Sequence, residues 1–261
     1  MEFIFLEFGQ LVMGAGLMIL TIAISAWHRL GLEYQLALAT GRASLQLLLM
    51  AYGLAIVFSF QSPWLIVGAL SLMVTVAAIT AKNRVGKNIP QMLPLMGIGI
   101  GFSTMLTLCY VAWLVVQPQP WYSPRYLVPL AGIVIGNSMN AGAIAGERLA
   151  TTIGQHHLEI ETHLSLGATP QQAIANYRKQ AIKTGLMPMI NSMMVVGLVT
   201  LPGIMSGQML GGIDPLQASA YQILIMFMLT FADMVTVVLV TWGLGEQFFN
   251  AAYQLKLIKH S

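Results

Sequence analysis

The stretch SAYQILIMFMLTFADMVTVVLVTWG, residues Ser219–Gly243, carries a single charged side chain, Asp233. A helix needs about 20 predominantly apolar residues to cross the hydrocarbon core of a bilayer. The run is continuously apolar and does not alternate in polarity, so it favours a helix over a strand of a membrane β-barrel. We therefore expect Ser219–Gly243 to be a transmembrane helix, with the rest of the chain built for the same solvent.

The composition of the whole chain agrees with a lipid environment. Of its 261 residues, 57% are hydrophobic and 8% are charged, whereas soluble domains have about 25% charged residues. The net charge is only +3, which does not favour nucleic acid as a partner. The single cysteine, Cys109, lies in an apolar run, so neither a disulfide framework nor a thiolate metal site is predicted. We expect a multi-pass protein of the plasma membrane, with the lipid bilayer as its surroundings.

Six further apolar runs have the length of a spanning helix, which predicts an all-α bundle of about seven transmembrane helices in a single domain, 1–261. The expected spans are 9–27, 36–60, 64–81, 93–116, 126–146, 185–210 and 219–243. Ten of the twelve Lys and Arg residues lie in segments on one side of this bundle: Arg29, Lys82, Arg84, Lys87, Arg148, Arg178, Lys179, Lys183, Lys256 and Lys259. Because basic loops stay in the cytoplasm, the N-terminus is predicted outside and the C-terminus cytoplasmic.

The longest polar interval, about 147–185, predicts a helix–turn–helix element on the basic side, which we name the hairpin. Thr169 suits an N-cap, Pro170 the first helical position, and Gln172 completes a capping box. Gly167 tolerates the left-handed backbone that ends the preceding helix, and Gly185 is expected to end the second helix. The hairpin is either a cap on the bundle or a docking site for a cytoplasmic partner.

Two features of the second hairpin helix follow from its spacing. Ile174, Tyr177, Ala181 and Ile182 form an apolar strip along it. Arg178 and the nearby lysines are predicted to lie elsewhere around the helix.

The hairpin resembles the EAA loop of ABC transporter permeases. In Glu161-Thr-His-Leu-Ser-Leu-Gly-Ala-Thr169 an acidic residue precedes a glycine by six positions, as in that loop, although Thr162 and His163 replace two alanines. In those permeases the element is the coupling helix, which inserts into a groove of the ATPase subunit. The resemblance implies that ATPase coupling falls to Glu159, Glu161, Leu164, Leu166, Gly167, Ala168, Thr169 and Pro170.

Four blocks extend the resemblance over about residues 35–245, namely Gly41–Leu54, Val128–Ala141, Leu164–Ala173 and Val196–Leu229. They are similar to the FetB-type permease family, which comprises bacterial iron-exporter permeases and plant aluminium-sensitivity proteins. The resemblance implies a half-transporter that forms a homodimer and works with a separate cytoplasmic ABC ATPase subunit. It also implies export of a metal ion such as iron, or of its complex.

The chain is not expected to be an enzyme. A Walker A loop needs G-x-x-x-x-G-K-[ST] so that backbone N–H groups can cradle phosphates. The nearest approach, Ala81–Asn88, has Ala81 in place of the first glycine and Asn88 in place of the hydroxyl residue. No cofactor is therefore predicted in this chain, and ATP and Mg²⁺ are expected on the partner ATPase.

Charged side chains within a membrane cost roughly 3 kcal/mol each, so they suggest a function. Arg42 either snorkels to the headgroups or faces the bundle together with Gln46, one turn away. Asp233 either binds a cation, pairs with a base such as Arg42, or is protonated and structural. The alternative to an ABC permease is therefore an ion-coupled carrier or passive channel with Asp233 as its cation or proton site.

Polar residues on two further spans complete the candidate path. Asn137 and Asn140 share a helix face, and Asn191 and Ser192 lie near the start of the span 185–210. These side chains either line the cargo path or form hydrogen bonds between helices.

The end of the span 185–210 has the residues of a gate. Pro202 is expected to kink it, just before the small residues Gly203 and Gly207. Such residues allow helices to approach closely, within one chain or between two copies. No set of side chains identifies a metal, so metal ligands stay unassigned.

Overall fold

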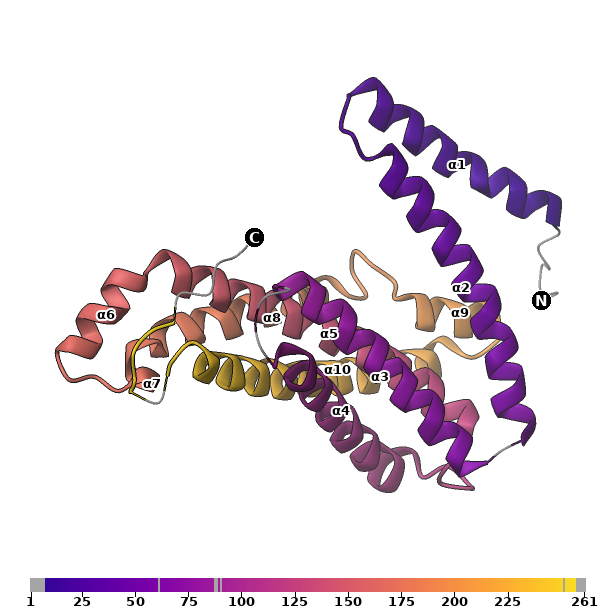
Figure 1. Cartoon of the computed structure of the whole chain (residues 1–261). Helices are drawn as coiled ribbons and strands as arrows, with labels where there is room; N and C mark the ends of the chain where they lie inside the picture. The colour runs from indigo at the N-terminus through magenta and orange to yellow at the C-terminus, as the bar shows by residue number, and fades with distance from the viewer. Residues whose placement is uncertain (1–7, 61, 87–88, 90, 251, 257–261) are drawn as a thin grey trace. The chain divides into compact units, whose positions relative to one another are not determined.

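The computed structural model describes residues 8–60, 62–86, 89, 91–250 and 252–256. Lys87, Asn88 and Lys259, which entered the charge pattern and the Walker A comparison, lie outside these residues. The chain divides into two compact units, one formed by residues 1–62 and 210–212 and the other by residues 63–209 and 213–261. The described residues of both units are mainly helical (Figure 1).

The first unit contains α1 (Phe8–Trp27) and α2 (Glu33–Phe60), which pack against each other. The turn between them has positive φ angles at Arg29 (52°) and Gly31 (70°). The Ser25 hydroxyl donates a hydrogen bond of 2.9 Å to Glu33 Oε1 and so ties the end of α1 to the start of α2. Both helices are apolar along their length, as a membrane span requires.

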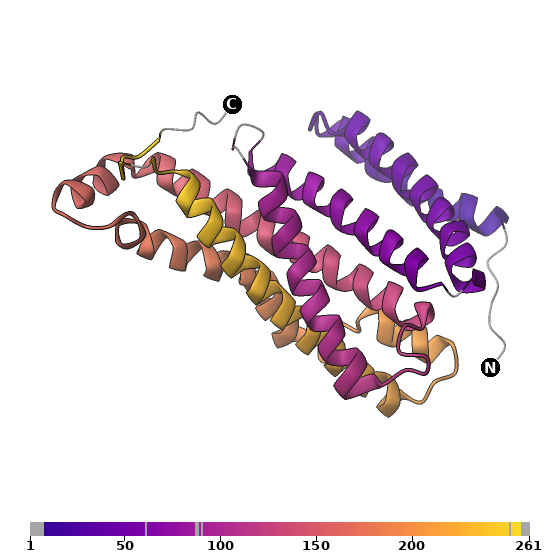
Figure 2. The ribbon, with the colours of Figure 1, turned by 60° about the horizontal axis from the view of Figure 1, so that its bottom comes forward.

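The second unit is built around α5 (Pro124–Gln155) and α10 (Pro215–Gln247), which pack against each other. Three further helices surround this pair: α3 (Pro63–Val85), α4 (Met92–Tyr110) and α8 (Ala175–Val195) (Figure 2). α4 continues into a π-helical segment, Val111–Val116. The largest fully buried side chains come from several of these helices and include Met92, Met96, Ile100, Val134, Leu149, Ile153, Val237 and Leu244.

In the described part of the chain, six helices are long and apolar enough to cross a membrane. They are α1, α2, α3, α4 with its π-helical segment, α5 and α10. Each contains one of the predicted spans, so helices at 9–27, 36–60, 64–81, 93–116, 126–146 and 219–243 are confirmed. Because these runs are continuously apolar, their length alone is enough to locate them in the sequence.

The predicted span 185–210 is wrong as a single helix. α8 begins within the hairpin and ends at Val195, and the chain turns at Gly197, where φ is 79°. A short helix, α9 (Gly203–Leu210), follows Pro202. The break has a local cause at Gly197, since glycine adopts the left-handed backbone readily; Pro202 lies beyond the break, directly before α9.

Gly185 does not end a helix, contrary to the sequence prediction, but lies in the middle of α8. A Cβ atom at this position would be 2.8 Å from the carbonyl oxygen of Ala141 and 2.8 Å from the Cβ of Ala145, both on α5. The glycine is therefore used for close contact between α5 and α8, as small residues are in membrane helix interfaces.

We expect Gly185→Ala to lower the free energy of unfolding by about 1–3 kcal/mol, because the added methyl group overpacks against backbone that cannot move aside. The measurement is thermal unfolding of the purified protein in detergent. Gly136→Ala on α5 is the matched control, since a Cβ atom there would meet nothing within 4 Å. Equal unfolding temperatures for the two variants would contradict this account of the α5–α8 contact.

α8 runs antiparallel to α10 along the second unit. Ile174 lies against Gly245, Gly185 lies against Val237, and the Thr230 hydroxyl donates to the Met193 sulfur at 3.2 Å. α8, the turn at Gly197 and α9 together therefore return the chain toward the start of α10. This segment is therefore not among the six helices of the described residues that are long and apolar enough to cross a membrane.

Candidate functional site

The second unit contains a cavity of about 320 Å³ lined by residues of α5, α8, α9 and α10. Six residues that the sequence analysis singled out as path or gate candidates line this one cavity: Asn137, Asn140, Ser192, Pro202, Gly203 and Asp233. They come from four separate segments of the chain, which the fold brings together.

The remaining path and gate candidates do not line this cavity. Asn191 is adjacent to the lining residue Ser192, Gly207 follows the lining residue Ile204 by three positions, and both positions are exposed. Arg42 and Gln46 lie on α2, in the first unit, and both are exposed. The cavity is therefore described without them.

Asp233 is the acidic residue of the cavity lining. It is 3% exposed, and the Ser138 hydroxyl donates to its Oδ1 at 3.4 Å. Among the described residues of the second unit, no basic side chain forms an ion pair with it. Its carboxyl group is thus held between α5 and α10 by one neutral contact and is left to face the cavity.

Two amide side chains add hydrogen-bond acceptors. Asn137 Nδ2 donates to the carbonyl oxygen of Ile133 at 2.9 Å, which leaves Asn137 Oδ1 as its acceptor. Gln222 is 7% exposed, and its Oε1 has no hydrogen-bond partner among the described residues. Both residues line the cavity, so its polar lining residues include two amide side chains besides the carboxyl group of Asp233.

Gln222 and Ser138 were missed in the sequence analysis. Gln222 precedes Asp233 by eleven positions, which is close to three helical turns, so the helical period places both on one face of α10. That spacing could have identified Gln222 from the sequence. No sequence pattern identifies Ser138 or the cavity-lining Pro188, because their neighbours depend on how α5, α8 and α10 pack.

The hairpin consists of α6 (His157–Ser165), α7 (Pro170–Ala173) and the first part of α8. The predicted capping box is confirmed: Gln172 N donates to Thr169 Oγ1 at 3.3 Å, and Thr169 N donates to Gln172 Oε1 at 2.9 Å. The predicted left-handed glycine is confirmed as well, since Gly167 has φ +91°. Gly167 N bonds to Leu164 O and Ala168 N to His163 O, which is the Schellman pattern of a helix end.

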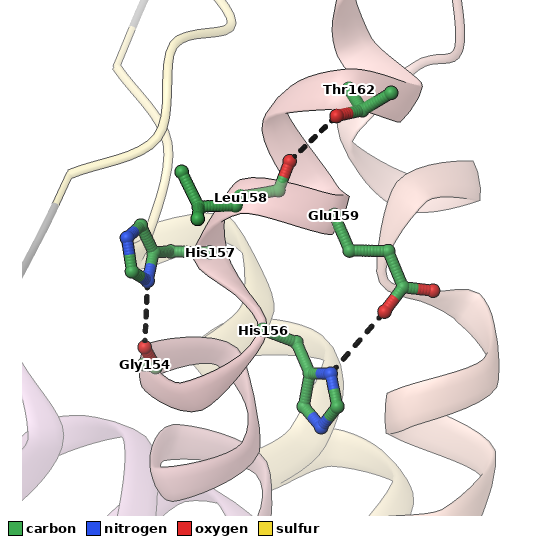
Figure 3. A network of polar contacts seen from close by, with 6 residues as sticks. All are labelled: Gly154, His156, His157, Leu158, Glu159 and Thr162. Carbon is green, nitrogen blue, oxygen red and sulfur yellow. Dashed lines mark hydrogen bonds and ion pairs between the residues drawn. The ribbon is translucent and has the colours of Figure 1, made fainter.

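Polar contacts link the end of α5 and the start of α6 across the joint between them (Figure 3). His156 Nδ1 lies 3.2 Å from Glu159 Oε2, and the His156 ring stacks on Tyr177 of α8 with 5.2 Å between ring centroids. The neighbouring Tyr177 hydroxyl lowers the pKa of the exposed Glu159 carboxyl. Burial, with a contribution from that carboxylate, raises the pKa of Tyr177 to about 12. The hairpin is thus held to α8 at the joint where it leaves α5.

The base of the hairpin packs on the end of α10. Ile174 is fully buried, and a Cβ atom at Gly245 would lie 2.8 Å from its Cδ1. Arg178 lies off the apolar strip, as predicted, yet it is only 7% exposed. Its guanidinium lies 4.2 Å from the ring centroid of Trp242 and donates to Gln171 Oε1. Burial lowers the pKa of Arg178, and the ring and amide contacts offset part of that desolvation.

The hairpin presents apolar side chains to solvent. Leu166, directly before Gly167 at the tip, is 80% exposed, and Leu158, near the start of α6, is 69% exposed. Figures 1 and 2 show α6 and α7 extending beyond the ends of α3 and α4. The hairpin is therefore a supported projection with an open surface, and not a cap that covers the bundle.

Within the described ranges, no group of three or more His, Cys, Asp or Glu side chains could hold a metal ion. Tight metal centres use several charged or imidazole ligands, so this finding leaves the metal ligands unassigned.

The comparisons with known proteins agree with this architecture. The family model UPF0014, described as an uncharacterised protein family, matches residues 8–249. The chain belongs to the UPF0014 family. A UPF0014 membrane protein of Synechocystis sp. is 47% identical over 92% of this chain and 93% of its own length.

Two further UPF0014 relatives carry descriptive names. Protein ALUMINUM SENSITIVE 3 of Arabidopsis thaliana is 34% identical over 91% of this chain and 86% of its own length. A protein of Escherichia coli (strain K12) named "Probable iron export permease protein FetB" is 32% identical over 94% of this chain and 93% of its own length. No solved structure matches the chain. The predicted family is confirmed, and this UPF0014 chain is a multi-pass membrane protein.

Proposed function

We propose that this UPF0014 chain is the permease subunit of an ABC transporter, which exports a metal cation such as iron, or its complex, with energy from a separate ATPase subunit. The relative named as an iron export permease supports the direction and the cargo. The cavity supports a cationic cargo, because its charged group is a carboxyl and its amide side chains offer acceptor oxygens.

One observation carries the proposal: two of the helices that line the cavity, α5 and α8, also carry the hairpin. α5 contributes Asn137 and Asn140 to the cavity and continues to Gln155, directly before α6. α8 contributes Ser192 and begins directly after α7. A force applied at the tip of the hairpin therefore reaches two cavity walls without passing through a flexible linker.

Coupling to ATP hydrolysis requires that the ATPase bind one conformation of the hairpin more tightly than another. The exposed Leu166 and the ordered turn at Gly167 support the tip, Leu164–Pro170, as the surface that the ATPase contacts. The permease is proposed to act as a homodimer, so that two tips meet two ATPase subunits and the cargo crosses between or within the two bundles.

Reconstitution with an ABC ATPase from the same organism tests the proposal. With the ATPase on the outside of liposomes, we expect Fe(II) or Mn(II) to accumulate inside, detected by quenching of an enclosed chelating dye. Uptake should need Mg-ATP and stop with an ATPase variant that lacks its catalytic glutamate.

Two other outcomes have separate meanings. ATP-driven pumping of neither cation would exclude the metal cargo but not the permease. Cation flux that follows an ion gradient and ignores ATP would favour the alternative of an ion-coupled carrier or channel with Asp233 as its site.

A further inference from the structure

We propose that Gln222 forms a second cation position in the cavity, about three helical turns from Asp233, which holds the ion through its water shell. The inference rests on the proposed function, because it assumes that the cavity is the cargo path. It assigns a role to a residue that the sequence analysis did not single out.

The first observation is that Gln222 has a buried hydrogen-bond acceptor, Oε1, for which the described residues supply no donor. Its side chain is 7% exposed, lines the cavity, and leaves Oε1 without a hydrogen-bond partner among the described residues. Buried polar atoms in folded proteins are nearly always paired. Because Gln222 lines the cavity, a ligand or its bound water that donates to this oxygen would satisfy it.

The second observation is the distance between Gln222 and Asp233. Eleven residues of helix rise about 16 Å along the axis. Oxygen ligands bind Mg²⁺ or Ca²⁺ at about 2.0–2.6 Å, so the two side chains cannot coordinate one bare ion together. They mark two positions along α10, and the charge pattern of the chain places the Gln222 position nearer the outer surface.

The third observation is the scarcity of strong ligands. Among the residues that the structure describes, those that line the cavity include one carboxyl group and no histidine or cysteine. Its volume of about 320 Å³ corresponds to roughly ten water molecules at about 30 Å³ each. An ion that enters this space has room to keep its waters, and an amide oxygen recognises such an ion by accepting hydrogen bonds from them.

The two positions differ in charge, so their affinities for a cation are expected to differ as well. An ionised carboxylate holds a hydrated cation more tightly than a neutral amide does. A cation that moves from Asp233 to Gln222 therefore passes to a weaker position that lies closer to the predicted outer side. This order suits release on that side.

The test is Mn(II) binding to the purified permease in nanodiscs, followed by EPR of the free ion, without ATPase or ATP. We expect the wild type to show a tighter and a weaker class of bound Mn(II). Gln222→Leu should remove the weaker class and keep the tighter one, which also shows that the variant is folded. Gln222→Glu should tighten the weaker class about tenfold, because it adds a charge at that position.

Gln208→Leu is the matched control. Gln208 also has an unpaired buried Oε1 but does not line the cavity, so this variant should bind like the wild type. A single class of Mn(II) in the wild type, or a weaker class that survives Gln222→Leu, would overturn the inference. Because the assay contains no ATPase, its result is independent of whether the chain is an ABC permease.

Discussion

Asp233→Asn is expected to reduce cation transport about 10- to 100-fold while the protein stays folded. Asparagine has nearly the shape of aspartate and can still accept the hydrogen bond from Ser138, so the packing between α5 and α10 is kept. The substitution removes the one carboxyl group of the cavity lining. Hydrogen bonds to charged groups contribute about 1.5–3 kcal/mol, and about 1.4 kcal/mol is a tenfold change in an equilibrium constant. The measurement is ATP-dependent Mn(II) uptake into liposomes.

Ser138→Ala separates the charge from its positioning. This variant removes the 3.4 Å contact to Asp233 Oδ1 and leaves the carboxyl in place, so transport should fall less than about threefold. A long neutral contact of this kind contributes little, near or below about 1 kcal/mol. Normal transport by Asp233→Asn would show that Asp233 has a structural role and would remove it from the cargo path.

Gly167→Val is expected to lower ATP-driven transport at least tenfold and to leave Mn(II) binding to the cavity unchanged. Gly167 has φ +91°, and its N–H and that of Ala168 close the end of α6. A β-branched residue is strongly disfavoured at positive φ, so the turn must rearrange and carry Leu166 away from its place. The measurement compares uptake with ATP hydrolysis in the same liposomes, where hydrolysis should continue without transport.

Gly167→Asn is the control for that variant. Asparagine enters the left-handed region far more readily than valine, so it should keep the turn and most of the transport. Because no atom lies within 4 Å of a Cβ at this position, the two variants differ in backbone preference and not in crowding. Undiminished transport by Gly167→Val would contradict a coupling role for the turn.

Features set by local chemistry were predictable from the sequence. Continuous apolar runs located six of the helices, because a membrane span needs length and hydrophobicity and little else. The turn at Gly167 and the capping box at Thr169 were predictable because both depend on the residue types themselves.

Features set by contacts between distant segments were not predictable. Gly185 was predicted to end a helix because glycine often does so. In the structure the helix continues through it, and α5 passes so close that only glycine fits at this position. From the sequence, Arg178 is expected on the surface. In the structure its guanidinium lies over the ring of Trp242, a residue more than sixty positions later in the chain. The sequence analysis named Asn137, Asn140, Ser192 and Asp233 as candidates for the cargo path. It could not show that these residues line one cavity, because that depends on how the helices pack.

The close fit at Gly146 has a mechanical consequence for α5. A Cβ atom there would be 3.0 Å from Val85 and 3.4 Å from Met92 and Met96, so the helix is pinned at this point against α3 and α4. Asn137 in the cavity wall and Gln155 at the root of the hairpin lie on opposite sides of the pin, each about 13 Å away along the axis. A rigid tilt of α5 about Gly146 would displace Asn137 and Gln155 by similar distances in opposite directions. Such a tilt would also have to loosen the close contacts that α5 makes at Gly132 and Gly142.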